Sequence, residues 1–173
     1  MDKRVKKTKE ALQKAYIVLV GKDPSKLPLV KDVCLQANVN KTTFYRHYED
    51  IYDLDKDTMN SVASTFIGNA DGLKRTSMTT EDILKWTVER AKNNSDAIEI
   101  FKNRFPELQA IMKKKLYKVL AALRPNFYTD TQAKFLSSGI VEVLSNYKHI
   151  DKNAISELAQ LINLINNSIK EGR

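Results

Sequence analysis

Apolar residues recur at spacings of three and four along nearly the whole chain, and no segment alternates with the two-residue period of a strand. This spacing is typical of amphipathic helices. Gly and Pro, which interrupt helices most strongly, number only 5 and 4 among 173 residues. We therefore predict an all-α fold. The expected helices, each with an apolar stripe of this spacing, cover approximately residues 8–20, 30–36, 41–47, 50–66, 80–91, 98–105, 106–124, 129–147 and 151–169.

Positive charge is concentrated at the start of the chain. The formal net charge of the whole chain is +8. Residues 1–48 contain 11 Lys and Arg against 4 Asp and Glu, a net of +7, whereas residues 49–57 carry a net of −4. A compact cationic segment is typical of a surface that binds nucleic-acid phosphates. On charge alone, a merely solvated surface is the alternative.

Composition and motifs exclude several classes of protein. Hydrophobic residues make up 42% of the chain, as in a globular protein, but no apolar run approaches the roughly 20 residues that span a bilayer. No apolar signal core follows the basic start, and a single cysteine, Cys34, suits a reducing compartment. We expect a cytoplasmic protein without a membrane partner. Without a phosphate loop, zinc spacing or nucleophile motif, we predict no enzyme activity, cofactor or metal site.

A helix-turn-helix pattern lies in residues 30–54, which read VKDVCLQANVNKTTFYRHYEDIYDL. Asn38 stands where the chain must turn, since Asn tolerates the left-handed backbone conformation better than most residues. Asn40 is expected to cap the second helix. Phe44 is expected to pack inward from that helix, and Val39 to anchor the turn.

The remaining side chains of the second helix are small and polar, aromatic or cationic. They are Lys41, Thr42, Thr43, Tyr45 and Arg46. Such a set can enter the major groove of DNA, where Thr and Tyr meet thymine methyl groups and Arg or Lys reaches guanine. The alternative is an ordinary packed pair of helices without a nucleic-acid partner.

This segment resembles the TetR (tetracycline-repressor) family of bacterial transcriptional regulators. The family pattern is Val-Arg-Asp-Ile-Ala, then Ala-Gly-Val, then Tyr-x-His-Phe followed by Lys and Leu. This chain contains VKDV, ANV, TTFYRHY and Leu54 in the same order. The preceding helix matches in spacing at Thr8, Leu12, Ala15 and Leu19. The close resemblance covers residues 8–55, and beyond them it extends only to an all-helical body ending in two long amphipathic helices.

The resemblance implies a helix-turn-helix DNA-binding domain over residues 1–50 and a helical ligand-binding and dimerisation domain over residues 51–173, joined by a fourth helix. It implies a homodimeric, sequence-specific regulator of double-stranded DNA with a near-palindromic operator, and a repressor that a small ligand releases. In the family, ligand binding shifts the fourth helix and changes the separation of the two recognition helices, which is about 34 Å on DNA.

The resemblance also assigns DNA contacts by motif position. Base or near-base contacts are expected at Lys31, Lys41, Thr42, Thr43, Tyr45 and Arg46. Phosphate contacts are expected at Tyr45 and His47, with Lys6 and Lys9 as additional contacts near the first helix. His47 also has a packing role as its alternative.

Three positions depart from the family pattern. Asn38 replaces the usual turn Gly, and Leu29 stands where a capping Thr or Ser is common. Ile51 replaces a Lys that grips a phosphate, and the neighbouring Glu49 and Asp50 leave that corner short of positive charge. We expect weaker phosphate anchoring there. This departure supports the alternative function, a protein-interaction or coactivator member of the same fold that binds DNA weakly.

In the body, the candidate ligand contacts are aromatic or Met side chains at helical spacing: Trp86, Phe101, Phe105, Met112, Tyr117 and Tyr128. Plain core packing is their alternative role. Because no buried charged residue is evident on an apolar face, a small apolar or aromatic ligand is expected. The apolar stripes of residues 129–147 and 151–169 predict a dimer interface, with Gly139 allowing close helix approach. Alternatively, these stripes face the core of their own subunit.

Overall fold

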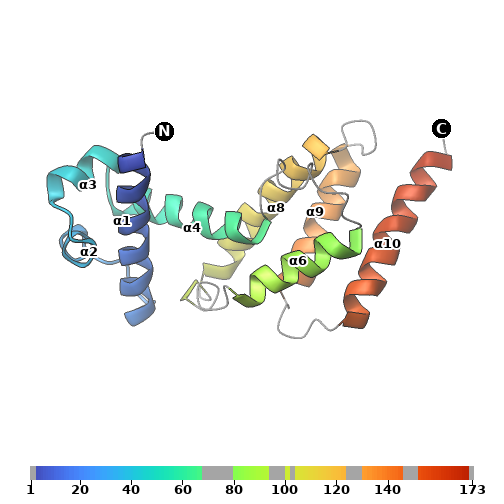
Figure 1. Cartoon of the computed structure of the whole chain (residues 1–173), viewed down its shortest axis with the longest axis horizontal. Helices are drawn as coiled ribbons and strands as arrows, with labels where there is room; N and C mark the ends of the chain where they lie inside the picture. The colour runs from blue at the N-terminus through green and yellow to red at the C-terminus, as the bar shows by residue number, and fades with distance from the viewer. Residues whose placement is uncertain are drawn as a thin grey trace. The chain divides into compact units, whose positions relative to one another are not determined.

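A computed structural model describes residues 3–67, 80–93, 100–101, 104–123, 130–145 and 152–171. Over these residues the chain contains helices and no strand, which confirms the predicted all-α fold (Figure 1). The helices are α1 (Lys3–Lys22), α2 (Val30–Ala37), α3 (Lys41–His47), α4 (Ile51–Ile67), α6 (Thr80–Asn93), α8 (Phe105–Leu123), α9 (Asp130–Ser145) and α10 (Lys152–Glu171). None of these helices is both long enough and apolar enough to cross a membrane.

The chain divides into two compact units. The first unit contains Met1–Val62 and Asp96–Phe105, and the second contains Ala63–Ser95 and Pro106–Arg173. Helix α4 therefore contributes its first turns to one unit and its last turn to the other. Residues 68–79, between α4 and α6, and half of the expected short helix at 98–105 lie outside the described residues.

Helix α1 is longer than the apolar stripe predicts. It begins at Lys3 rather than Thr8, because the straight-chain basic residues that precede Thr8 favour a helix and no breaker interrupts them. The expected start signal at Thr8 is therefore wrong. The Thr8 hydroxyl donates to the carbonyl oxygen of Arg4 at 3.0 Å, within the helix, instead of capping its first turn.

The core of the first unit is built from the apolar faces of its four helices. Helix α1 packs on α2, and α2 packs on α3. In α4 the buried residues of this unit include Leu54, Thr58 and Val62, and the buried Phe66 further along the helix belongs to the second unit. The core side chains that are at most 2% exposed in this unit are Leu12, Tyr16, Val33, Phe44, Tyr48, Leu54, Thr58, Met59 and Phe101.

A carboxylate lies inside this apolar core. Asp55 of α4 is only 5% exposed. The Tyr16 hydroxyl of α1 donates to Asp55 Oδ1 at 2.6 Å, and one guanidinium nitrogen of Arg104 lies 2.7 Å from both carboxylate oxygens. A buried charge is tolerated only when it is paired and hydrogen-bonded. Asp55 therefore joins α1, α4 and the segment around Arg104 within the first unit.

Asp55 corrects the expectation that no charged residue is buried on an apolar face. It lies in the acidic run of residues 49–57, which on sequence alone is typical of a solvated surface. Burial raises the pKa of the Tyr16 phenol, and its hydrogen bond to the charged Asp55 raises the pKa further. Tyr16 therefore stays protonated and remains a donor at physiological pH.

The second unit has its own apolar core. Helix α6 packs against α9 and α10, and it buries Leu84 and Val88. Helix α8 buries Leu108, Met112 and Val119, while α10 buries Ile155, Ala159 and Ile162. The buried face of α9 is made by Ala133, Leu136, Ser137 and Val141. The neighbouring Ile140 is only half-buried, because Val141 occupies the packed face at this turn of α9.

Replacing Arg104 with Ala tests the importance of the buried ion pair. Arg104→Ala leaves the Asp55 carboxylate buried without its cation, so we expect the free energy of unfolding to fall by about 2–4 kcal/mol. Urea denaturation of the two proteins measures this difference. Lys26→Ala is the matched control, because the Lys26–Asp23 pair is exposed and its loss should leave the free energy of unfolding nearly unchanged. Equal stability of the Arg104→Ala variant and the wild type would contradict the assignment.

Candidate nucleic-acid interface

The turn between α2 and α3 has the geometry that the sequence predicts. Asn38 has φ 53° and ψ 47°, the left-handed conformation, and among the described residues it is the one non-glycine residue with positive φ. The Val39 amide donates to the carbonyl oxygen of Cys34 at 2.9 Å, and the Asn38 amide donates to that of Leu35 at 3.2 Å. These bonds satisfy carbonyl groups that the end of α2 leaves free.

Helix α3 begins at a side-chain cap. The Asn40 side-chain oxygen accepts a hydrogen bond from the Thr43 amide at 2.7 Å, which confirms the expected cap. The Phe44 amide donates to the Asn40 carbonyl oxygen at 3.1 Å. Helix α2 has no such cap, since Leu29 at its start makes no side-chain hydrogen bond, as expected from the loss of Thr or Ser.

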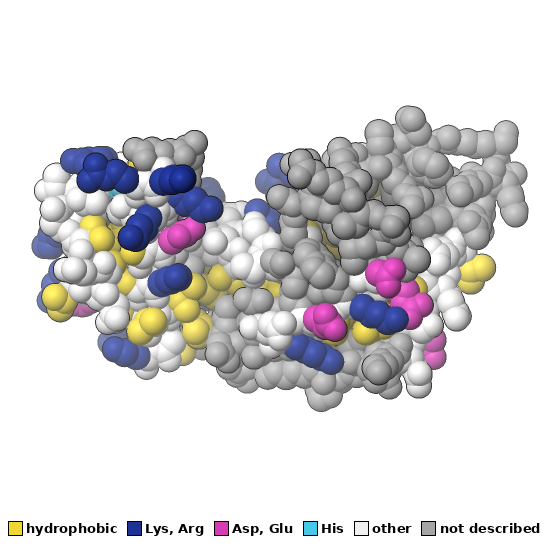
Figure 2. Space-filling model, in the orientation of Figure 1, with side chains coloured by type: hydrophobic (Ala, Val, Ile, Leu, Met, Phe, Trp, Pro, Cys, Tyr) yellow, Lys and Arg dark blue, Asp and Glu magenta, His cyan; other side chains and the backbone are white. Residues whose placement is uncertain are grey.

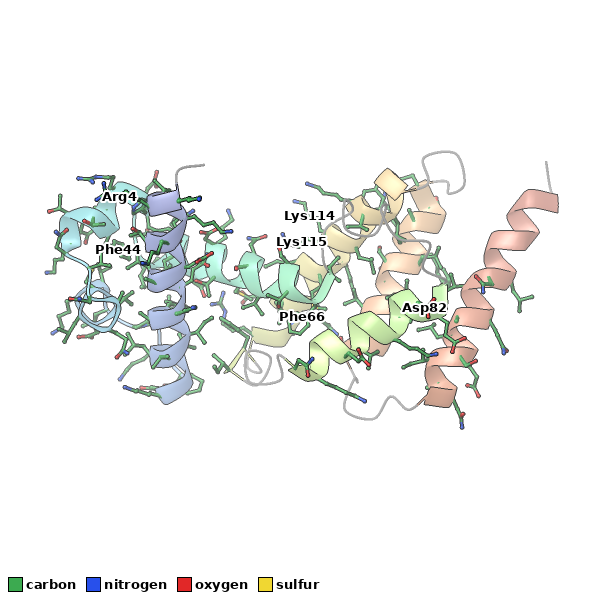
Figure 3. The ribbon with its side chains drawn as sticks, in the orientation of Figure 1. Arg4, Phe44, Phe66, Asp82, Lys114 and Lys115 are labelled. Carbon is green, nitrogen blue, oxygen red and sulfur yellow. The ribbon has the colours of Figure 1, made fainter. Side chains whose placement is uncertain are left out.

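Phe44 and Tyr48 hold α3 on the core of the first unit. Phe44 is completely buried and turns into the interior of this unit (Figure 3), while Tyr48, just after the helix, is 2% exposed. Their ring centroids lie 5.8 Å apart. The Phe44 ring also makes an edge contact with Tyr45, at 5.3 Å between centroids. One side of α3 therefore packs on the core, and the other side is exposed to solvent.

The outer side of α3 carries the side chains that were predicted to contact DNA. Lys41, Thr42 and Arg46 are exposed, and Tyr45 is 57% exposed. The other expected contacts are Thr43 and His47 of α3, which are half-buried, and Lys31 of α2, which is exposed. Lys and Arg side chains are prominent on the visible surface of the first unit (Figure 2). The candidate interface is therefore a short helix that packs on an apolar core and presents polar, aromatic and cationic side chains on its other side.

Two further lysines were expected to assist phosphate binding. Lys6 is exposed and lies 3.9 Å from Glu10, an i,i+4 pair that water screens. Lys9 is less exposed, and its ammonium group lies 2.9 Å from the carboxylate of Asp57. Lys6 therefore remains a predicted phosphate contact. The charge of Lys9 is instead matched by the carboxylate of Asp57.

Acidic side chains cap the start of α4. Asp50 Oδ1 accepts the Asp53 amide at 2.9 Å, which confirms Asp50 as the cap, and Asp53 Oδ2 accepts the Glu49 amide at 3.3 Å. Negative charge near a helix start is favourable because of the helix dipole. Ile51, in place of the family's Lys, is half-buried. This corner therefore offers a phosphate neither a cationic side chain nor the Asp53 amide.

Cys34 lies on the inner side of α2 and is 5% exposed. Burial raises the pKa of its thiol, although the nearby positive charge of Lys41 acts in the opposite direction. A protonated, buried thiol packs as a small apolar side chain and is a weak nucleophile. Among the described residues, no group of three or more His, Cys, Asp or Glu is placed to hold a metal ion.

An open pocket of about 250 Å³ lies within the first unit. Its polar lining includes the Asp55–Arg104 pair and Lys26, and its apolar lining includes Val20 and Phe101. Phe101 is the candidate ligand contact that lines this pocket, and the side chain itself is 1% exposed.

The other candidate ligand contacts belong to α6, α8 and the residues that follow α8. Met112 is buried in the second unit, and Tyr117 is half-buried, with its hydroxyl donating to Asp130 Oδ1 at 2.6 Å. Tyr128 and the side chains of Trp86 and Phe105 lie outside the described part of the chain. Of the candidates that the structure describes, one therefore lines a pocket of the first unit and two belong to α8 of the second unit.

The fold is similar to that of a solved TetR transcriptional regulator from Streptococcus agalactiae 2603V. The two chains are 24% identical, the similarity covers 97% of this chain and 96% of that one, and the TM-score is 0.53. No protein-family model and no curated protein sequence matches the chain. The likeness confirms the fold that the resemblance of residues 8–55 implied.

Substitutions at Asn38 test the left-handed turn that precedes α3. A Cβ atom in this conformation costs free energy, which Asn tolerates better than Ala and which Gly avoids. We expect Asn38→Ala to lower the free energy of unfolding by about 1 kcal/mol and Asn38→Gly to change it by less than about 0.5 kcal/mol. Urea denaturation measures both. A variant with Ala that is as stable as the variant with Gly would exclude the left-handed turn.

Proposed function

We propose that this chain is a transcriptional regulator that binds double-stranded DNA sequence-specifically, with α3 as its recognition helix. The observation that carries the proposal is the two-sided character of α3. One side is fastened by the fully buried Phe44, and the other presents Lys41, Thr42, Tyr45 and Arg46 to solvent. The fold it shares with a TetR transcriptional regulator supports the same function.

In this proposal, different side chains of α3 have different tasks. Arg46 and Lys41 hydrogen-bond guanine, and Thr42, Thr43 and Tyr45 contact base edges, including thymine methyl groups. His47 and Tyr45 contact phosphates, and Lys31 of α2 contributes a further base or near-base contact. Phosphate contacts position the protein, while base contacts read the sequence. Lys6 at the exposed side of α1 adds positive charge for the backbone.

We further propose that the chain acts as a homodimer through α9 and α10. Large apolar side chains are normally buried, yet Phe135 of α9 is 68% exposed, and Leu161 and Leu164 of α10 are 54% and 63% exposed. Gly139 of α9 has no heavy atom within 4 Å of an added Cβ, so a second helix can approach closely there. Two identical recognition helices read two half-sites, so the operator is a near-palindrome.

The proposal also includes control of DNA binding by a small-molecule effector. The regulator acts as a repressor, and a small apolar or aromatic molecule bound by the second unit releases it from DNA. Helix α4 supports this coupling, because one continuous helix supplies residues to both units. A panel of such compounds tests this part: loss of duplex binding supports it, and unchanged binding with every compound opposes it.

The recognition role is tested with variants of α3 on the duplex that the wild type binds best. Arg46→Ala should weaken binding by about 1–3 kcal/mol and relax the preference at one base pair per half-site, because one guanine contact is lost. Tyr45→Ala should also weaken binding. Lys114→Ala, an exposed lysine of α8, is the control and should leave affinity nearly unchanged. If neither α3 variant differs from the control, α3 is not the recognition helix.

The dimer is tested at an exposed side chain, so that dissociation is separated from unfolding. Leu164→Glu places a charge in the proposed interface and should give folded monomers in sedimentation, with helical content unchanged. Leu35→Glu, at an 83% exposed leucine of α2, is the matched control and should remain dimeric. Ile162 of α10 is not used for this substitution, because it is buried within its own unit and a charge there would also destabilise the fold. A wild type that is monomeric at micromolar concentration would contradict the assignment.

A further inference from the structure

Three donors converge on one oxygen of Asp57. Lys9 Nζ lies 2.9 Å from Asp57 Oδ2, Gln13 Nε2 lies 3.1 Å from it, and the Tyr48 hydroxyl lies 2.8 Å from it. Lys9 and Gln13 are one turn apart on α1, Tyr48 directly follows α3, and Asp57 belongs to α4. We call these four residues the Asp57 cluster. It connects three helices of the first unit by polar contacts alone.

Within the cluster, the negative charge of Asp57 is matched by the positive charge of Lys9 and by two neutral hydrogen-bond donors. Burial opposes ionisation of Asp57, but the hydrogen bonds from Lys9, Tyr48 and Gln13 and the charge of Lys9 outweigh it and lower the pKa of the carboxyl. Burial raises the pKa of the Tyr48 phenol, as do its hydrogen bond to Asp57 and the charge of that group. Asp57 is therefore the acceptor and Tyr48 the donor at any physiological pH. The ammonium group of Lys9 also lies 4.9 Å from the centre of the Tyr48 ring.

Tyr48 is the member of the cluster that acts on α3. It is the C-terminal cap of this helix, and its amide donates to the Phe44 carbonyl oxygen at 3.0 Å. The ring of Tyr48 is buried beside Phe44, and this contact restrains translation of the helix. Apolar packing is non-directional, however, so it restrains rotation of the helix less. The hydroxyl adds a directional bond at one end of the helix, and that bond restrains rotation.

We infer that the Asp57 cluster is a positioning device for the recognition helix, in which Asp57 sets the orientation of α3 through Tyr48, and Lys9 and Gln13 hold Asp57. The inference rests on the proposed DNA-reading role of α3. It gives Lys9 a role inside the protein in place of the phosphate contact that its position suggested. Tyr48, Lys9 and Gln13 then affect the choice of DNA sequence without touching DNA.

Positioning and phosphate binding have different signatures. Base readout requires hydrogen-bond geometry, so a small rotation of α3 weakens specific binding. Phosphate attraction depends mainly on the number of charges and is less sensitive to rotation. Loss of positioning should therefore reduce the ratio of specific to random-sequence affinity, with the salt dependence unchanged. Loss of a phosphate contact should weaken both kinds of DNA together and reduce the salt slope by about 0.9.

The experiment compares Tyr48→Phe and Lys9→Gln with the wild type on a selected duplex and on random-sequence duplex at several salt concentrations. We expect each variant to lose about three- to tenfold in the ratio of specific to random affinity, the range of one hydrogen bond, at an unchanged salt slope. Lys6→Gln should instead weaken both DNAs and flatten the slope. Gln109→Ala, which removes the side-chain hydrogen bond from Gln109 to Ser145 in the second unit, should change neither quantity.

Hydrogen exchange of the free protein separates this inference from the proposed function. Tyr48→Phe should speed exchange of the α3 amides, and Gln109→Ala should not. If α3 exchange rises but no duplex is bound, the proposed function fails and the mechanical role of the cluster remains. Unchanged α3 exchange, or an unchanged affinity ratio in both cluster variants, overturns the inference. A flattened salt slope in Lys9→Gln overturns it as well, because Lys9 would then be a phosphate contact.

Discussion

A carboxylate that is withdrawn from water needs donors in the protein, and α4 places two carboxylates against α1, the buried Asp55 and the partly exposed Asp57. Asp55 meets the Tyr16 hydroxyl and the guanidinium of Arg104, and Asp57 meets Lys9 and two neutral donors. Each pairing requires its partners at hydrogen-bond distance, so it constrains geometry more narrowly than apolar contact does. These pairings add contacts of defined distance between α1, α4 and the end of α3 to the apolar packing of the first unit.

The acidic run of residues 49–57 acquires a structural explanation from these contacts. On sequence alone, a net charge of −4 beside a cationic segment looks unfavourable for a surface that binds phosphate. In the structure, Asp50 and Asp53 accept backbone amides at the start of α4, and Asp55 and Asp57 are matched by donors from other segments. Two of these carboxylates are therefore matched by donors within the unit, and two more cap α4 while they remain exposed.

Features with a local cause could be predicted from the sequence. The period of apolar residues predicted the helices, and the conformational tolerance of Asn predicted the left-handed residue at position 38. Asn40 and Phe44 likewise took their predicted roles. Burial of Asp55 could not be predicted, because its partners lie 39 and 49 residues away in the chain. For the same reason, the sequence does not show whether the charge of Lys9 is matched by a DNA phosphate or by the carboxylate of Asp57.

The proposed reading of DNA by α3 is tested most directly by selection of bound sequences from a pool of random double-stranded DNA with the intact chain. Paired recognition helices predict enrichment of a near-palindrome, with half-site centres about one helical turn apart or a multiple of it. Base-specific contact by Arg46 predicts a guanine at a fixed position in each half-site. A pool that stays random after repeated rounds, although the protein is folded, would contradict sequence-specific binding and favour a partner other than DNA.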